Sequence, residues 1–298
     1  MSALRVGIVG CGRLAELGYV PAIAGTSAVE LVAVADPDPA RRKALAGDGV
    51  SAFEDAAQLA ESGAAEAVIV ASPPAHHLEH ARLAAEAGLP CLVEKPPAPD
   101  AEGARVIAGL DPAPWLGLNR RFDLLGSLRE RIPDDGPLEL ELEISYRRAS
   151  WRPHEVRDDA LTDLGAHLAD LALHLAGGGA ARVARAQSGP DRAELELELA
   201  RGRALLRAAT DRPYRERGVA RRPGGEQLGS VSTPGAVLGL VGRLRGREHP
   251  LVASLRAQVE AFARAARGGD PGPLATAADG LRAMVLIDEA RVMAGGRT

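Results

Sequence analysis

Cysteine, surplus positive charge and long apolar segments are all scarce in this 298-residue chain. It contains no run of about 18 apolar residues, so no transmembrane helix is expected. The formal net charge of −4 at pH 7 argues against nucleic-acid or anionic-membrane partners, because both require concentrated positive charge. What remains is the composition of a globular protein, with 46% hydrophobic and 26% charged residues, and a length that suits two domains.

The few cysteines and histidines indicate neither a disulfide framework nor a metal site. Cys11 and Cys91 lie far apart in predicted buried strand ends, which favours a reducing cytoplasm as the protein's location. The N-terminus leads directly into a strand and lacks the features of a secretory signal. His76, His77 and His80 share a predicted helix, but no set of thiolates or carboxylates accompanies them, so no metal is expected.

Strands and helices alternate over the first 118 residues. Strands are expected at Leu4–Val9, Glu30–Ala35, Ala67–Ala71, Leu89–Val93 and Trp115–Leu118, with helices at Arg13–Ala24, Pro39–Ala46, Ala75–Ala87 and Asp100–Leu110. Short apolar strands separated by helices of about ten residues are typical of βαβ units. The alternation therefore predicts an α/β fold, a parallel Rossmann sheet covered by helices on both faces.

The first predicted strand leads into Gly10-Cys11-Gly12-Arg13-Leu14-Ala15, a G-x-G-x-x-A pattern. Gly10 permits the tight turn, Gly12 lets backbone amides approach a pyrophosphate, and the small Ala15 lets the helix pack close to the strand. The free N–H groups of the helix N-terminus then face the phosphates. Such a turn alone is a weak signal, but here a strand precedes it and a helix follows, which favours a dinucleotide site.

Asp36 ends the second predicted strand, about 20 residues after the glycine-rich turn, where an acid can bind the adenosine ribose hydroxyls. Its charge would repel a 2′-phosphate, so NAD(H) is favoured as the cofactor. Arg41 and Arg42 leave NADP(H) open, because either could pair with that phosphate. The segment Asp36-Pro37-Asp38-Pro39 also has the residue types of a turn. Asp36 can bind the ribose and form part of this turn at the same time.

Further motifs carry a resemblance to a known family. They are Ser72-Pro73-Pro74 followed by His76, Glu94-Lys95-Pro96-Pro97, Gly117-Leu118-Asn119-Arg120-Arg121-Phe122, and Asp163-Leu164-Gly165-Ala166-His167. Together with Gly10-Cys11-Gly12 they resemble the Gfo/Idh/MocA family, named for glucose–fructose oxidoreductase and inositol dehydrogenase. The resemblance runs in register from about residue 4 to residue 176.

The resemblance implies that Lys95 lies beside the nicotinamide and that Asp163 and His167 contact the substrate. The residue types agree with these roles: Lys95 follows a strand at the end where α/β sheets bind ligands. Asp163 and His167 are four residues apart on a predicted helix and share one face, where the carboxylate can orient a proton-carrying imidazole. Taken one at a time, Lys95 could be a solvated residue at a strand end, Asp163 a helix cap and His167 a core histidine. The occurrence of all three motifs in this order on one Rossmann frame favours the catalytic interpretation.

Several other residues are predicted to contact the cofactor or the substrate because of where they stand in these motifs or near the domain crossover. Additional cofactor contacts are expected from Arg13, Leu14, Ser72, Pro73, His76 and Glu94. Pro73 could equally be a plain helix-start proline, and His76 is expected to cap or line the cofactor cleft. Arg121 and Trp151 are candidate substrate contacts, with a structural salt bridge as the alternative for Arg121. Many family members have a glycine-rich turn before D-x-G-x-H, whereas here residues 157–160 read Arg-Asp-Asp-Ala, so this segment must be built differently.

Residues 119–298 are expected to form an α+β substrate domain on a mostly antiparallel sheet, after a Rossmann domain at residues 1–118. Pro137–Tyr146 and Ala193–Ala200 alternate apolar residues with glutamate, and Arg203–Thr210 is the expected hairpin partner of the second. A helix at about Asp158–Ala176 should pack under the apolar face. Gly218–Gly246, rich in glycine, arginine and proline, is expected to be an irregular loop.

Two helices, at about Leu251–Ala266 and Pro273–Ala294, are expected to close the chain, and the last could pack back on the Rossmann domain. The second sheet's polar face carries glutamates, unlike the apolar centre of an obligate interface, so a monomer or a homo-oligomer is expected, with a dimer favoured. These glutamates are Glu139, Glu141, Glu143, Glu194, Glu196 and Glu198.

The sequence predicts a cytoplasmic NAD(P)-dependent dehydrogenase or ketoreductase that moves a hydride between the nicotinamide and a carbinol or carbonyl carbon. The resemblance indicates a sugar, a sugar derivative or a cyclitol as the small-molecule substrate. An imine reductase on the same scaffold and a non-catalytic dinucleotide-binding regulatory protein stay open as alternatives. The presence of Lys95 and His167 argues against the regulatory protein.

Overall fold

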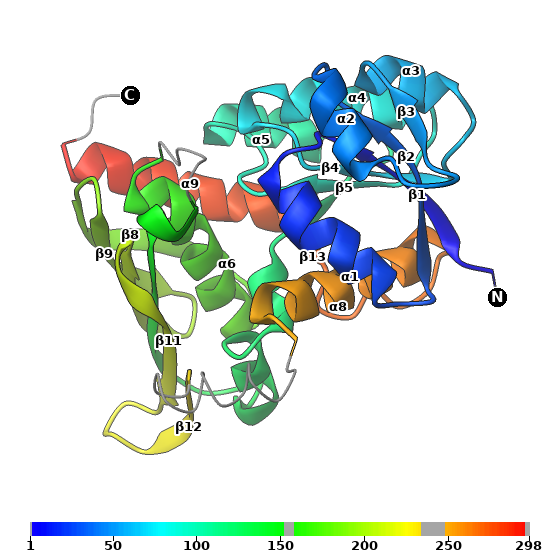
Figure 1. Ribbon diagram of the computed structural model, residues 1–298. Helices are drawn as coiled ribbons and strands as arrows, with labels where there is room; N and C mark the ends of the chain where they lie inside the picture. Colours follow the sequence, from blue (N-terminus) through cyan, green and yellow to red (C-terminus); the bar gives the residue numbers. More distant parts are fainter. Residues whose placement is uncertain (1, 152–157, 234–247, 296–298) are drawn as a thin grey trace. The chain divides into compact units, whose positions relative to one another are not determined.

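The computed structural model describes residues 2–151, 158–233 and 248–295 (Figure 1). The chain divides into two units, and each is described by itself. The first comprises Met1–Asn119 and Glu248–Leu281, and the second comprises Arg120–Arg247 and Arg282–Thr298. Residues 248–281 thus belong with the Rossmann unit, although the boundary expected after residue 118 assigned them to the second domain.

The first unit is built on a seven-stranded sheet, parallel except for one short edge strand. Across the sheet the strands are β13 (Ala275–Thr276), β6 (Trp115–Gly117), β5 (Cys91–Glu94), β4 (Ala67–Val70), β1 (Leu4–Val9), β2 (Val29–Ala35) and β3 (Ser51–Phe53). Strand order reverses at β1, which lies between β4 and β2, as in a doubly wound sheet. The predicted Rossmann fold is confirmed.

Helices cover both faces of this sheet. They are α1 (Val20–Ala24), α2 (Pro39–Leu45), α3 (Ala56–Glu61), α4 (His77–Glu86), α5 (Ala101–Ala108) and α8 (Pro250–Ala266). Figure 1 shows α3, α4 and α5 on one face and α1 with α8 on the other. β3 and α3 were not predicted from the sequence; β3 is a three-residue edge strand with largely exposed side chains and so lacks an apolar run.

Aspartate side chains fix where several of these helices begin. Asp38 accepts a hydrogen bond from Ala40 N at 2.8 Å, and Asp100 accepts one from Gly103 N at 2.8 Å. These bonds satisfy N–H groups that have no partner within the helix. The helices therefore begin close to the predicted positions.

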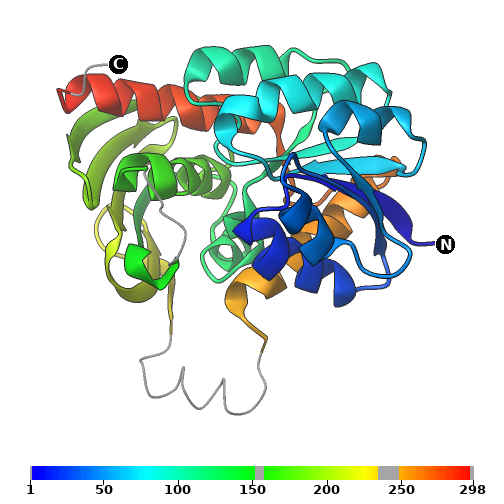
Figure 2. The same cartoon turned by 45° about the horizontal axis from the view of Figure 1, so that its top comes forward.

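The second unit is built on a six-stranded sheet that is antiparallel except for the pairing of β7 with β10. Across the sheet the strands are β12 (Gln227–Ser232), β11 (Asp211–Arg221), β7 (Leu138–Arg147), β10 (Gly202–Ala209), β9 (Arg192–Leu199) and β8 (Ala181–Ser188). α6 (Ala166–Leu175) packs against β7 and β10, and it is the green helix beside this sheet in Figure 2. The expected mostly antiparallel sheet is confirmed.

Leucine and glutamate alternate along β7 and β9, and this alternation separates the two faces of the sheet. Leu140, Leu142 and Leu197 are buried, whereas the glutamates between the leucines are partly or fully exposed. On the polar face Arg207 Nε donates to Glu194 Oε2 at 2.8 Å, as the register between β9 and β10 predicts. The predicted hairpin of these strands is confirmed.

The expectation of an irregular loop over Gly218–Gly246 is wrong for its first half. The end of β11 and all of β12 are paired strands, and residues 234–247 lie outside the described part of the chain. A Cβ on Gly218 would lie 2.6 Å from Leu128 Cδ1, and one on Gly229 would lie 3.0 Å from Arg131 Cδ. Glycine makes room there for the 3₁₀ segment Gly126–Arg131, and this removes the alternating pattern by which a strand is recognised.

The last helix, α9 (Ala277–Met293), begins four residues later than expected, after β13. Its C-terminal part belongs to the second unit, where Glu289 Oε2 accepts a hydrogen bond from Val183 N at 3.0 Å. The strand β13 was not predicted, and it occupies residues that were expected to start the helix.

Gly202 is the position at which the second sheet depends most on glycine. Its φ is +149°, and a Cβ there would lie 1.8 Å from Leu138 O. We expect Gly202→Ala to lower the free energy of unfolding by at least about 3 kcal/mol, because β7 and β10 would have to separate. Gly177→Ala is the matched control: it has φ +78° with no atom within 4 Å of its Cβ and should cost only about 1–2 kcal/mol of backbone strain. Urea unfolding measures both, and equal losses would contradict the steric explanation.

Candidate active site

The carboxyl ends of β1, β2, β4 and β5 lie along one edge of the first unit's sheet and carry most of the predicted cofactor residues. In open α/β sheets, ligands bind at this edge, where the strand order reverses. Here the reversal occurs between β4 and β1. The segments that follow these two strands are therefore the expected centre of the site.

The glycine-rich turn has the geometry of a phosphate cradle. Gly10 has φ +96°, and a Cβ there would lie 2.6 Å from Ser72 N, so only glycine lets the turn after β1 approach the segment after β4. A Cβ on Gly12 would have no atom within 4 Å, which leaves open space beside its backbone. Ala15 is fully buried, and Arg13 and Leu14 form the first helical residues after the turn. The turn thus fits the pyrophosphate of a dinucleotide.

Asp36 lies beside this turn and holds it in place. Its Oδ2 accepts a hydrogen bond from Cys11 N at 2.8 Å, and its Oδ1 accepts one from Asp38 N at 2.9 Å. Asp36 therefore acts as a turn residue, as one of its two predicted roles requires. Its side chain is buried, with 7% of the residue exposed. Burial, followed by the nearby Asp36 charge, raises the pKa of the Cys11 thiol to about 12, so Cys11 stays protonated.

The two arginines that left NADP(H) open are engaged by neighbouring groups. Arg42 Nη1 donates to Asp36 O at 2.6 Å and to Pro37 O at 3.2 Å. Arg41 Nε lies 3.4 Å from Asp38 Oδ2 in an exposed ion pair. Arg42 thus helps to fix the backbone at the end of β2.

The segment after β4 interacts with a histidine that the sequence analysis did not select. His76, the predicted cofactor residue, is exposed and stacks on His80, with ring centroids 5.9 Å apart. The next residue, His77, is fully buried, with Nδ1 2.9 Å from Pro96 O and Nε2 2.7 Å from Ser72 O. Burial lowers the pKa of His77, while the two carbonyls act in the opposite direction. Two adjacent histidines at a helix start give no sequence signal of which one faces inward.

Ser72 also contacts the third histidine of this group. Ser72 Oγ lies 2.9 Å from Nδ1 of His80, which is partly buried. Pro73, the other predicted cofactor residue here, is exposed at the rim and precedes the short 3₁₀ helix Pro74–His76. The Ser72 side chain and carbonyl are therefore both held by α4.

Glu94 and Lys95 end β5, and the carboxylate of Glu94 lies among buried polar groups. Its Oε1 accepts a hydrogen bond from Tyr19 OH at 2.5 Å, and its Oε2 accepts one from Lys95 N at 3.0 Å. Gln258 Nε2 in turn donates to Tyr19 OH at 3.0 Å. Burial raises the pKa of Glu94. Glu94 therefore fixes the Lys95 backbone, and no pattern in the sequence linked it to Tyr19 and Gln258.

Asp163 lies in a π-helical turn, Leu161–Gly165. This turn continues into α6, which carries His167. The helix after the glycine-rich turn likewise contains a π turn, Ala15–Tyr19, directly after its first two residues. Both segments were expected to be regular helices, and π turns occur frequently at functional sites. Asp163 is partly buried and accepts a short hydrogen bond from the hydroxyl of Tyr146, on β7, which the sequence analysis also missed. His167 is 5% exposed.

The arginines at the crossover are held by carboxylates within the second unit. Arg121 forms a buried bidentate pair with Asp170 of α6, with Nε to Oδ2 at 2.9 Å and Nη2 to Oδ1 at 2.5 Å. The salt-bridge alternative for Arg121 is therefore present. Trp151 ends a 3₁₀ turn, and the structure describes its backbone but not its side chain.

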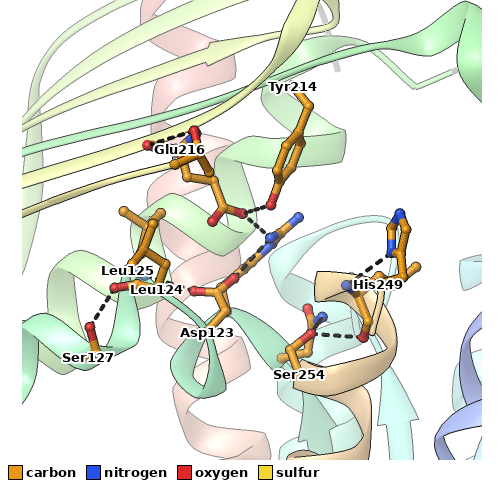
Figure 3. A network of polar contacts seen from close by, with 12 residues as sticks. Asp123, Leu124, Leu125, Ser127, Tyr214, Glu216, His249 and Ser254 are labelled. Atoms are coloured by element: carbon orange, nitrogen blue, oxygen red, sulfur yellow. Dashed lines mark hydrogen bonds and ion pairs between the residues drawn. The ribbon is translucent and has the colours of Figure 1, made fainter. Parts of the chain in front are cut away.

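Figure 3 shows Asp123, Tyr214 and Glu216 converging on one polar network. Its cation is Arg120, whose Nη1 donates to Asp123 Oδ2 at 2.9 Å and also to Glu216 Oε1, while Tyr214 OH donates to Glu216 Oε1 at 2.7 Å. Burial raises the pKa of Asp123 and of Glu216, and the adjacent guanidinium opposes this. Two carboxylates thus share one guanidinium.

Two features are absent from the residues that the structure describes. Within them no three His, Cys, Asp or Glu side chains come together in a way that could bind a metal ion. None of the helices there combines the length and the apolar surface needed to cross a membrane.

Comparison with known proteins places this site in a family. Residues 4–110 match the oxidoreductase family with an NAD-binding Rossmann fold. The rhizopine catabolism protein MocA of Rhizobium meliloti is 31% identical over 321 aligned residues, which cover 97% of this chain and 95% of that protein. Inositol 2-dehydrogenase of Corynebacterium glutamicum is 34% identical over 185 residues, which cover 59% of this chain and 55% of that enzyme.

Solved structures share the fold over the whole chain. A crystal structure of an oxidoreductase from Agrobacterium radiobacter, in complex with NAD+, L-tartaric acid and magnesium, gives a TM-score of 0.75 at 21% identity and covers 99% of this chain and 98% of that chain. With the near full-length match to MocA, the chain belongs to the Gfo/Idh/MocA family of NAD-binding oxidoreductases.

Proposed function

We propose that this protein is an NAD-dependent dehydrogenase that acts on a CH–OH group of a sugar, a sugar derivative or a cyclitol. The observation that carries the proposal is the position of Lys95, which follows β5 at the same sheet edge as the phosphate cradle, with only β4 between β5 and β1, and whose backbone is fixed by Glu94. Family membership and the inositol dehydrogenase relative support the substrate class.

The Gly10–Ala15 turn would hold the pyrophosphate, and Asp36 would bind the adenosine ribose. Both Asp36 oxygens already accept one N–H, but a carboxylate oxygen accepts more than one hydrogen bond, so a ribose hydroxyl can still be bound. When bound, NAD(H) supplies the hydride acceptor or donor. Pro73 and His76, at the exposed rim after β4, remain predicted contacts.

Lys95, His167 and Asp163 are proposed to act on the reacting oxygen of the substrate. Lys95 places a cationic donor at that oxygen, and His167 takes its proton in oxidation or returns it in reduction. Asp163, held by Tyr146, orients His167 or a substrate hydroxyl. Arg121 and Trp151 stay predicted substrate contacts.

Lysine itself is rare in this chain, which strengthens the assignment of Lys95. Lys95 and Lys43 are the only lysines among 36 lysine and arginine residues. An arginine keeps its proton at any physiological pH, whereas an ammonium can donate one. Apart from Lys43 the other cationic side chains of the lysine and arginine set are arginines, and lysine stands at this strand end, where the proposed proton transfer needs it.

We infer that the protein is a monomer or a homodimer. Most glutamates of the second sheet's polar face pair with arginines of the same sheet; for example, Arg221 Nη1 donates to Glu141 Oε1 at 2.8 Å. Because that face is neutralised by its own side chains, a second copy would not need to supply arginine partners.

The catalytic assignment is tested by replacing Lys95 and His167. Lys95→Met and His167→Asn should each lower kcat by at least about a hundredfold while NADH affinity stays within a few-fold, since a proton-transfer group is lost and the phosphate cradle is intact. The double mutant should lose less than the product of the single effects. Lys43→Met, on the exposed surface of α2, is the matched control. The assay screens myo-inositol and methyl glucosides with NAD+; normal turnover by Lys95→Met would refute the assignment, and NADH binding without any turnover would favour the regulatory protein.

Cofactor preference tests the role of Asp36. We expect NADH to bind at least about tenfold more tightly than NADPH, because the Asp36 carboxylate would face the 2′-phosphate. Fluorescence titration of both reduced cofactors measures the ratio. Arg41→Ala should leave it unchanged, and a preference for NADPH that this variant abolishes would show that Arg41 governs the site.

Gly12→Val tests the phosphate cradle separately from stability. The Gly12 Cβ position is open, so the variant should fold with an unchanged Tm, yet its side chain would occupy the pyrophosphate space and abolish NADH binding. Gly10→Ala, by contrast, should lower Tm, because its Cβ would collide with Ser72 N. NADH binding by Gly12→Val with wild-type affinity would place the cofactor elsewhere.

A further inference from the structure

One fully buried imidazole joins the segments that follow two neighbouring strands. His77 is the first residue of α4 and is 0% exposed. Its Nε2 lies 2.7 Å from Ser72 O, just after β4, and its Nδ1 lies 2.9 Å from Pro96 O, just after β5. β4 and β5 pair directly in the sheet, and Figure 1 shows α4 beside them. The ring therefore spans the gap between two adjacent strand ends.

The two contacts use opposite edges of the ring, and few other side chains could make both. Carbonyl oxygens only accept hydrogen bonds, so each contact draws a ring N–H toward it. The imidazolium donates to both carbonyls, and each neutral tautomer donates to one. Asparagine and glutamine carry their donors on a single nitrogen at one end, so either could replace only one of the contacts.

Both carbonyls belong to segments that the proposed function uses. Pro96 directly follows Lys95, whose amide is bound from the other side by Glu94 Oε2 at 3.0 Å. The short segment that carries Lys95 is thus held at both ends, by Glu94 and by His77. Ser72 forms the wall against which Gly10 packs, since a Cβ on Gly10 would lie 2.6 Å from Ser72 N. Moving the Ser72 backbone would therefore disturb the phosphate cradle.

We propose that His77 is a positioning residue that sets the place of Lys95 through Pro96 O and the place of the phosphate cradle through Ser72 O. This inference rests on the proposed function, which gives Lys95 and the phosphate cradle their roles. The two hydrogen-bond contacts of His77 are observed whatever the function is. His77 touches neither cofactor nor substrate in this account. It acts by holding two backbone segments in register.

Two conservative substitutions separate the two contacts. The amide of His77→Asn lies near the place of Nδ1 and should keep the Pro96 contact, whereas that of His77→Gln reaches the place of Nε2 and should keep the Ser72 contact. His77→Asn should therefore bind NADH about fivefold more weakly, with normal amide exchange at Lys95 and at Ala98, the first residue after Pro96 and Pro97 that carries an amide N–H. His77→Gln should bind NADH normally, with about fivefold faster exchange at those two amides. NADH fluorescence and hydrogen–deuterium exchange give the two readouts.

The control is His249→Asn, since His249 is an exposed N-cap of α8 and asparagine is an equally good cap. It should change neither readout. Identical NADH affinity and identical exchange in the two His77 variants would overturn the proposal, because a residue that only fills space would affect both segments together. If the variants do not fold, the wild-type protein still decides: a His77 ring N–H protected from solvent exchange in NMR is expected, and rapid exchange of every ring N–H of His77 would overturn the proposal. If the wild-type protein turned over none of the substrates tested, the proposed dehydrogenase activity would be refuted. The NADH affinities and amide exchange rates of the His77 variants would still test the positioning role.

Discussion

The close approach of the β1 turn to the segment after β4 is the constraint on which the rest of the site depends. It requires a residue without a side chain at Gly10, with φ +96°, because any Cβ would meet the Ser72 backbone. The approach brings the phosphate cradle to the point where strand order reverses. Asp36 then holds Cys11 N from one side, and His77 holds Ser72 O from the other. The turn after β1 and the segment after β4 are thus each fixed by a side chain that binds a backbone group, Asp36 after β2 and His77 at the start of α4.

Much of the first unit could be predicted from the sequence, because parallel strands buried on both faces give uninterrupted apolar runs such as Ala67–Val70. The antiparallel β7 and β9 were equally clear from their alternation. β11 and β12 were not, because glycines at the contact with the Gly126–Arg131 segment removed the alternating pattern. β3 was missed because an exposed three-residue edge strand buries too little to leave a pattern.

The motifs of the site were recognisable, but the groups that support them were not. Gly10, Asp36 and Lys95 stand where the strand-and-turn order predicts. Tyr19 bonds to Glu94 across 75 positions of sequence, and such long-range pairs leave no local signal. His77 rather than His76 faces inward, a difference of one residue at a helix start. Both π turns also escaped prediction, because they differ from α-helix in hydrogen bonding and not in composition.

The central claim is that Lys95 lies beside the bound nicotinamide, and the chain's two lysines allow a direct measurement. An amine-specific acetylating reagent modifies Lys95 and Lys43, and mass spectrometry follows each rate with and without saturating NADH. The account predicts that NADH slows acetylation of Lys95 several-fold and leaves Lys43, on the exposed face of α2, unchanged. Equal rates at Lys95 with and without NADH, under conditions where the cofactor is bound, would contradict it.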